Sequence, residues 1–167
     1  MGTVTTIATS VTPSGVPAGV DFSPKSDILY VGDAAFTTKV EAFAFPTGTP
    51  LAGSPYTYSL GSDSSTVLAS KDGQCLFVAN QFSSGVTSIP LSGGIPGATA
   101  KFFPAGSGGF PAGMANDING KMFYVASFPD NTVTTEIIGS GCGLTESPGG
   151  PVRTGTPGFP ASLAASP

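Results

Sequence analysis

Three segments of this sequence align with one another without a gap, and they decide its fold. They are PAGVDFSPKSDILYVGD at residues 17–33, SSTVLASKDGQCLFVAN at residues 64–80 and PAGMANDINGKMFYVAS at residues 111–127. The second and the third each begin 47 residues after the segment before them, and a further copy, PASLAASP, begins at residue 160. A period of this size indicates a repeat architecture in which each copy forms one supersecondary unit.

Each copy has the pattern of a β-hairpin. A short stretch with alternating apolar residues leads into a turn, which we place near Lys25-Ser26 in the first copy. In the later copies the turns contain Asp72-Gly73 and Asn119-Gly120, pairs that accept the positive φ angles of two-residue primed turns. A dense apolar run follows each turn, as expected of a strand covered on both faces. These runs occupy residues 28–31, 75–78 and 122–125.

Two more strands complete each unit. Third strands are predicted at residues 40–45, 86–91 and 133–138, and looser segments around residues 55–60 and 99–103 supply the fourth. Four strands in about 40–50 residues is the size of one blade of a β-propeller. The sequence therefore predicts an all-β fold, a β-propeller of four-stranded blades.

The repeat boundaries give about three whole blades and two partial ones. The whole blades are residues 17–63, 64–110 and 111–159, and the partial blades are residues 1–16 and 160–167. The chain starts at a third strand, because TVTT at residues 3–6 matches TVTT at residues 132–135. Incomplete blades expose unpaired strand edges, so we expect them to pair with each other or to self-associate with another copy. A fragment of a larger ring, an oligomer and a small four-bladed ring remain open.

Composition narrows the setting in which the protein works. Hydrophobic residues make up 40% and charged residues only 10%, against about 25% in a typical soluble domain. Such an uncharged surface favours an exported protein, extracellular or periplasmic, whose signal peptide is absent from this sequence. The six Lys and Arg residues are scattered and the net charge is −4, which argues against nucleic acid. No apolar stretch approaches the length of a membrane span.

The two cysteines allow one disulfide. Cys75 lies in an apolar run and Cys142 in a glycine-rich loop. We expect Cys75 to be a buried, unreacted thiol, with a bridge to Cys142 as the alternative.

Phenylalanines recur in the loops that a propeller places on one face. Phe36, Phe82 and Phe128 follow the second strands, whereas Phe110 and Phe159 precede the inner strands. These rings either stack on a carbohydrate or grip an apolar protein partner, or they fold inward as wedges between blades, and we favour the wedge. The polar ligand-face candidates at the same rim are Asp33, Asn80 and Asp130.

Residues for common catalysis are missing from the sequence. It contains no His, which removes the usual nucleophilic triads and most zinc sites. Most of the carboxylates lie in turn signals, where a capping role is the ordinary interpretation. We expect no catalytic residue, no metal and no cofactor.

The runs LYVGD at 29–33, LFVAN at 76–80 and FYVAS at 123–127 resemble the YVTN-type repeat. With AGSPY at 52–56, the chain is similar to the seven-bladed lactonase-type propellers, which include 6-phosphogluconolactonase-like proteins. The resemblance implies His and Arg around a central channel, yet the single Arg, Arg153, lies outside the repeat motifs. We therefore predict a non-catalytic scaffold or binding module. The alternative is a segment of a lactonase-like hydrolase whose catalytic residues lie in other blades.

Overall fold

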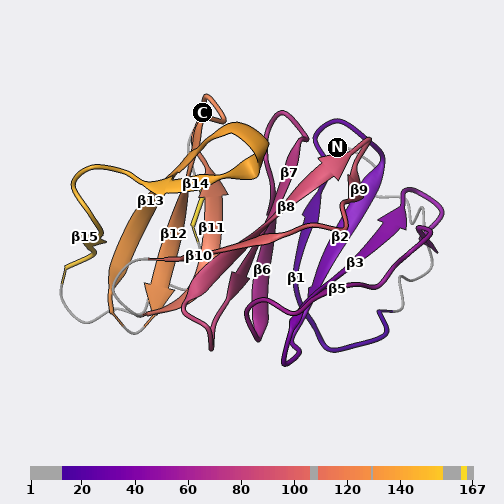
Figure 1. The fold of residues 1–167 in the computed structure, drawn as a ribbon, viewed down its shortest axis with the longest axis horizontal. Coiled ribbons are helices and arrows are strands. Elements are labelled where there is room, and N and C mark those ends of the chain that lie inside the picture. The colour runs from indigo at the N-terminus through magenta and orange to yellow at the C-terminus, as the bar shows by residue number, and fades with distance from the viewer. Residues whose placement is uncertain (1–12, 106–108, 129, 156–162, 165–167) are drawn as a thin grey trace, which may run out of the picture.

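The computed structural model describes residues 13–105, 109–128, 130–155 and 163–164, and these residues form three antiparallel sheets side by side (Figure 1). Blade 1 contains β1 (Pro17–Phe22), β2 (Ile28–Asp33), β3 (Thr38–Ala44), β4 (Thr49–Pro50) and β5 (Tyr56–Tyr58). Blade 2 contains β6 (Ser64–Ala69), β7 (Cys75–Asn80), β8 (Gly85–Ser92), β9 (Ile95–Pro96) and β10 (Lys101–Pro104). Blade 3 contains β11 (Phe110–Asn116), β12 (Met122–Phe128), β13 (Thr132–Ile138), the 3-10 turn η1 (Ser140–Cys142), β14 (Leu144–Glu146) and β15 (Val152–Arg153).

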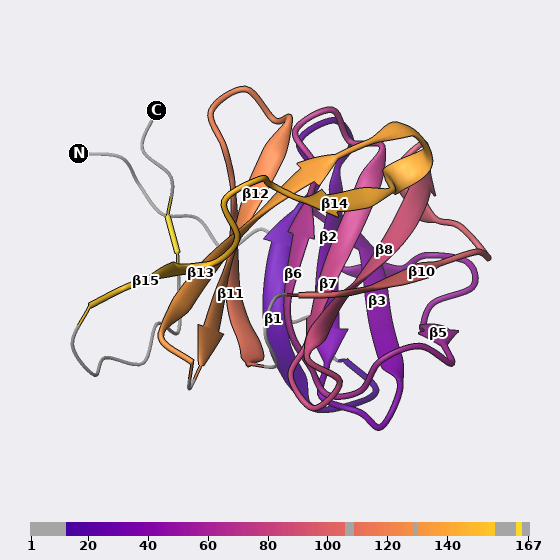
Figure 2. The same cartoon turned by 60° about the vertical axis from the view of Figure 1, so that its left-hand side comes forward.

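Each sheet is a four-stranded meander whose outermost strand is interrupted. In blade 1 both β4 and β5 pair with β3, at its two ends. Blades 2 and 3 repeat this arrangement, with β9 and β10 on β8, and β14 and β15 on β13. The prediction of an all-β propeller with four-stranded blades is confirmed, and the three sheets fan around a common side where the inner strands lie (Figure 2).

The hairpin turns lie where the sequence predicts them, but they are not two-residue primed turns. β6 and β7 are separated by residues 70–74, and Ser70 N–H donates to the Cys75 carbonyl at 2.9 Å. Gly73 alone in this turn has a positive φ, 69°, and Gly120 has 67° in the equivalent turn. A type I′ turn requires positive φ at both central residues, so the prediction of the turn type was wrong.

The blades pack face to face, and each blade has two faces. We call the face toward the preceding blade its N-side face and the face toward the following blade its C-side face. In blade 2, Val67 and Val78 on the N-side face pack into the core shared with blade 1. Phe77 on the C-side face stacks on Phe123 of blade 3, with ring centroids 4.4 Å apart. Because β7 is covered on both sides, all of its residues are buried, as the dense apolar run predicts.

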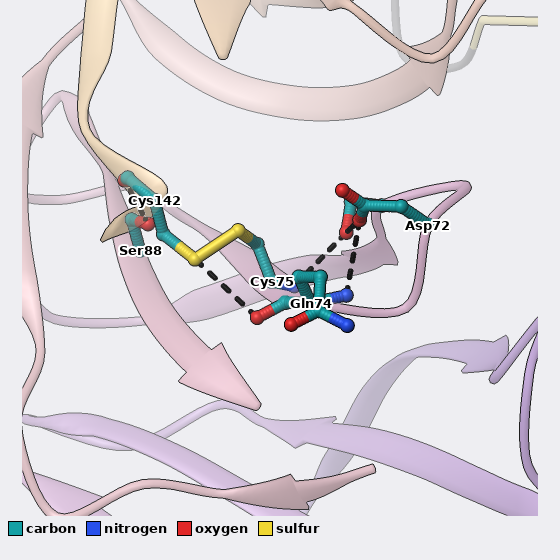
Figure 3. The surroundings of a disulfide bond; sticks show 6 residues. Asp72, Gln74, Cys75, Ser88 and Cys142 are labelled. Carbon is teal, nitrogen blue, oxygen red and sulfur yellow. Dashed lines mark hydrogen bonds between the residues drawn. A yellow bond between two sulfur atoms is a disulfide. The ribbon is translucent and has the colours of Figure 1, made fainter. Parts of the chain in front are cut away.

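A disulfide joins blades 2 and 3, so the expectation of a free Cys75 thiol was wrong. Cys75 opens β7 and Cys142 lies in η1, and their sulfurs are bonded across the interface (Figure 3). Ser88 Oγ donates to the Cys142 carbonyl at 2.6 Å and fixes η1 against β8. Sequence could not place the two Cβ atoms, because the cysteines are 67 positions apart and the chain between them spans more than one blade.

Some predictions lie outside the described residues. The strand expected at residues 3–6 is one, and most of the inner strand expected from residue 160 is another; Leu163 and Ala164 are described and carry no strand. No helix in the described part of the chain is long and apolar enough to cross a membrane.

Candidate functional site: a phenylalanine rim

Antiparallel pairing brings the candidate residues to one edge of the three sheets. The end of each second strand lies opposite the start of the inner strand, and the register pairs Pro17 with Asp33, Ser64 with Asn80, and Phe110 with Phe128. The connections that follow the second strands leave from this same edge. We call this edge, with Phe36, Phe82, Phe110 and Phe128, the phenylalanine rim.

The rings of the rim are not all wedges between blades. Phe36, in the β2–β3 connection, is 95% exposed, and Phe82, in the β7–β8 connection, is 67% exposed. Phe128 is less exposed, and Phe110 is half-buried. The wedge interpretation was therefore wrong for Phe36 and Phe82. Phe159 lies outside the described residues.

The rim is continuous across the three blades. Phe36 and Phe82 line one hollow of about 140 Å³. The ring of Phe82 meets that of Phe110 edge-on, with centroids 6.0 Å apart, and Phe110 is the cross-strand partner of Phe128. Connected aromatic surface of this kind is typical of an interaction site on a soluble protein.

The hollow contains residues that sequence reasoning missed. Ala34, Ala35 and Asp63 complete its lining. Asp63 lies in the connection before β6 and has a positive φ of 59°, while its N–H donates to the Ala35 carbonyl at 2.6 Å. The signal in the sequence is its position: Asp63 lies directly before an inner strand, in the same class of connection as Phe110 and Phe159.

Asn80 proves to be a structural residue between blades 1 and 2. It is fully buried, and its Nδ2 donates to Thr87 Oγ1 at 2.9 Å. Its Oδ1 accepts the Thr38 hydroxyl of blade 1 at 2.8 Å. A Cβ added to Gly61 would lie 2.6 Å from the Asn80 side chain, so the connection must carry glycine there. Asn80 is not available to a ligand at the rim.

Asp33 occupies the equivalent position in blade 1 and is also buried. Its Oδ2 lies 2.9 Å from Lys39 Nζ, and Glu41 Oε1 lies 3.7 Å from the same nitrogen. Ser14 donates to Glu41 Oε1 through its N–H at 2.6 Å and its hydroxyl at 2.8 Å. Burial raises the pKa of Asp33, with Lys39 opposing. Burial also opposes ionisation of Glu41, but its hydrogen bonds to Ser14 and Asp33 outweigh this and lower its pKa.

Asp130 lies nearest the Phe128 end of the rim. It is half-buried, and its Oδ2 is enclosed with no hydrogen-bond partner in the part of the chain that the structure describes. A Cβ added to Gly109 would lie 2.8 Å from that oxygen, so the connection before β11 passes close over it. Of the three polar candidates, only Asp130 is partly accessible at the rim.

The rim is apolar with two carboxylates. Asp63 lies in the hollow and Asp130 beside Phe128, and none of the described residues that line the hollow is a Lys or Arg. Within the ranges that the structure describes, no three residues of His, Cys, Asp or Glu come close enough to hold a metal. Such a surface accepts apolar or uncharged groups and disfavours anions.

The comparisons with known proteins give the class of fold. No family model matches the chain, and no curated protein matches it. Solved structures do: the periplasmic gluconolactonase PpgL of Pseudomonas aeruginosa has a TM-score of 0.65 at 16% identity, with 86% of this chain and 44% of that chain covered. A putative 6-phosphogluconolactonase from Bacteroides uniformis gives 0.66 at 14% identity, with 84% and 45% covered.

The WD40 repeats of RRP9 match as well, with a TM-score of 0.69 at 14% identity and coverage of 92% and 43%. The chain is thus a partial β-propeller that resembles both lactonase-type and WD40 propellers. It spans less than half the length of these structures. Identities this low establish the fold alone, and a propeller supports many functions.

Proposed function

We propose that this chain is a non-catalytic propeller module that binds an apolar segment of a protein partner through the phenylalanine rim. The observation that carries the proposal is the pair of exposed rings, Phe36 and Phe82, on either side of one small hollow. Large aromatic side chains left in water on a loop edge favour a binding role, because burial against a partner removes their apolar surface from water.

The size of the hollow favours a protein segment over a sugar. A volume of about 140 Å³ holds one apolar side chain, and aromatic-lined pockets of this kind anchor protein interfaces. The absence of cations from its lining argues against phosphorylated or carboxylated ligands. A carbohydrate that stacks on the rings is the competing ligand, and the test below separates the two.

We also propose an oxidising compartment, extracellular or periplasmic. The Cys75–Cys142 disulfide supports this, because disulfides persist in exported proteins and are rare in a reducing cytosol. The low proportion of charged residues supports the same compartment.

Selection of peptides tests the binding role. A random 12-residue peptide library is panned on the immobilised chain, and an array of neutral oligosaccharides is probed in parallel. We expect peptides with an apolar anchor to be enriched, and the double variant F36S/F82S to bind them at least about tenfold more weakly. Ile118→Ser is the matched control, because Ile118 is 57% exposed in the hairpin turn at the opposite edge and its loss leaves the rim intact.

Two results would contradict the proposal. One is enrichment of oligosaccharides without peptides. The other is peptide binding that F36S/F82S and Ile118→Ser change equally.

The alternative is that the chain is part of a lactonase-like hydrolase. The likeness to the gluconolactonase and to the putative 6-phosphogluconolactonase favours it, and the catalytic residues would then lie in other blades. We expect the chain by itself to hydrolyse δ-gluconolactone no faster than buffer does. Turnover above the uncatalysed rate that survives purification would contradict the proposal of a non-catalytic module and place catalytic residues in this chain.

A further inference from the structure

The N-side face of blade 1 differs from the same face of the other blades. Val20 in β1 is 64% exposed, whereas Val67, its equivalent in β6, is 4% exposed and packs against blade 1. Phe22 and Phe45 are also exposed on this face, and their rings meet edge-on at 5.1 Å. Val31, Glu41 and Phe43 on the same face are buried, so the open part is limited to the region around Val20, Phe22 and Phe45.

The C-side face of blade 3 is open in a complementary way. Tyr124 is half-buried, although Tyr30 and Phe77 at the equivalent positions of blades 1 and 2 are fully buried. Val152 is 67% exposed. It occupies the position of Tyr56, because Val152 pairs with β13 as Tyr56 pairs with β3. Tyr56, in contrast, packs against the core between blades 1 and 2. Both end faces therefore carry core positions of the repeat that no blade formed by the described residues covers.

We propose that these two faces bind each other between copies: the N-side face of blade 1 receives the C-side face of blade 3 from a second copy of this chain. The repeat indicates that the partner of each face is a second copy of the chain. Within the chain, a C-side face already packs on an N-side face twice, between blades 1 and 2 and between blades 2 and 3. The part of the solved propellers that this chain matches is 43–45% of their length, so a ring of their size has further blades on both sides of such a unit.

A specific hydrogen bond is expected at this contact. Within the chain, the Tyr30 hydroxyl donates to the Gly94 carbonyl of the next blade at 2.6 Å. Tyr124 stands in the place of Tyr30, and Gly48 directly precedes β4 as Gly94 directly precedes β9. The Tyr124 hydroxyl should therefore donate to the Gly48 carbonyl of the second copy.

The contact is heterologous, because it joins two different surfaces. Such a contact generates a closed ring when the rotation between copies permits, and a longer open assembly when it does not. Either form is larger than one chain, so a mass measurement reports the contact directly.

Mass photometry and sedimentation equilibrium on the whole chain test the proposal. We expect a species of twice the 16.5 kDa chain mass, or larger, at micromolar concentration. Val20→Lys and Val152→Lys each place a charge on one of the two faces, and each should raise the dissociation constant about a hundredfold. Because Val20 and Val152 are exposed, both variants should keep the far-ultraviolet spectrum of the unaltered chain.

Mixing the two variants gives a sharper result. A Val20→Lys copy keeps an intact C-side face and a Val152→Lys copy keeps an intact N-side face, so the mixture should regain one contact and form two-chain species. Phe36→Lys is the control: it lies on the phenylalanine rim and should leave the mass unchanged while it weakens peptide binding. A mass of one chain at every concentration overturns the proposal, as does a mixture that stays monomeric.

Discussion

The two interfaces within this chain use the same repeat positions with different chemistry. Between blades 1 and 2, the contact is apolar packing and a buried network of Thr38, Asn80 and Thr87. Between blades 2 and 3, the disulfide and the Phe77–Phe123 stack are added, but Glu136 replaces the apolar residue of the core. In blade 2 that position is Ile89, which is fully buried.

Glu136 places an ionisable group in the core of the second interface. Burial raises the pKa of its carboxyl to about 7, and Glu146, its cross-strand partner, adds repulsion. Its Oε1 is enclosed and has no hydrogen-bond partner among the described residues. The buried carboxyl should lower stability, whereas the disulfide raises it by constraining the unfolded chain.

The largest expected effect comes from breaking the disulfide. The double variant C75S/C142S removes a cross-link between residues 67 positions apart, so the unfolded chain gains conformational entropy. The free energy of unfolding should fall by about 4 kcal/mol. Urea denaturation followed by circular dichroism measures this. The unaltered chain in dithiothreitol should match the variant, whereas a reductant that leaves the unfolding midpoint unchanged would show that the bond is absent.

The second expected effect tests the other interface. Asn80→Ala leaves the buried Thr38 and Thr87 hydroxyls without their amide partner, which should cost about 3 kcal/mol of unfolding free energy. Asn119→Ala is the matched control, because Asn119 is exposed in a hairpin turn and its loss should change stability by less than about 0.5 kcal/mol. Equal stability of the two variants would show that the network does not hold blades 1 and 2 together.

The smallest expected effect concerns pH. Because the folded pKa of Glu136 is about 7 against a usual 4.5, the folded state holds its proton more tightly than the unfolded state. The contribution of Glu136 to stability is therefore fully present below pH 4.5 and is lost as the pH rises to about 7. The loss should be about 2 kcal/mol.

Comparison with Glu136→Gln isolates this contribution, since the variant should be the more stable protein at pH 8 and should lose the advantage at pH 4.5. Glu146→Gln removes the charge repulsion on Glu136, so it should lower the pKa of Glu136 and narrow the pH range over which stability falls. A difference between the unaltered chain and Glu136→Gln that is the same at both pH values would argue against a shifted carboxyl.

Strand positions were predictable because their signals are local. The alternation around Val67 and the dense run at residues 75–78 depend only on neighbours along the chain, and both became strands as expected. The turn type was less predictable, because Asp72-Gly73 suits more than one hairpin turn. The length of the connection at residues 70–74 depends on the pairing register of β6 and β7.

The candidate site was predictable in place but not in detail. The repeat topology predicted that Phe36, Phe82 and Phe110 lie at one edge of the sheets, and the structure places them together there. Their exposure and the burial of Asn80 depend on how the neighbouring blade is placed, and that placement is not encoded in any one segment.

By itself, the sequence determined the period, the strand order within a blade and the edge at which the loops gather. These follow from residue spacing, because apolar alternation and turn residues act over a few positions. Only the tertiary structure decided that Cys75 meets Cys142, that Glu136 is buried in a core and that Asp33 and Asn80 face inward. The disulfide and the burial of Glu136 and Asn80 depend on the surface of an adjacent blade, which pairs or desolvates a side chain from more than 40 residues away. Asp33 is instead paired within its own blade, with Lys39.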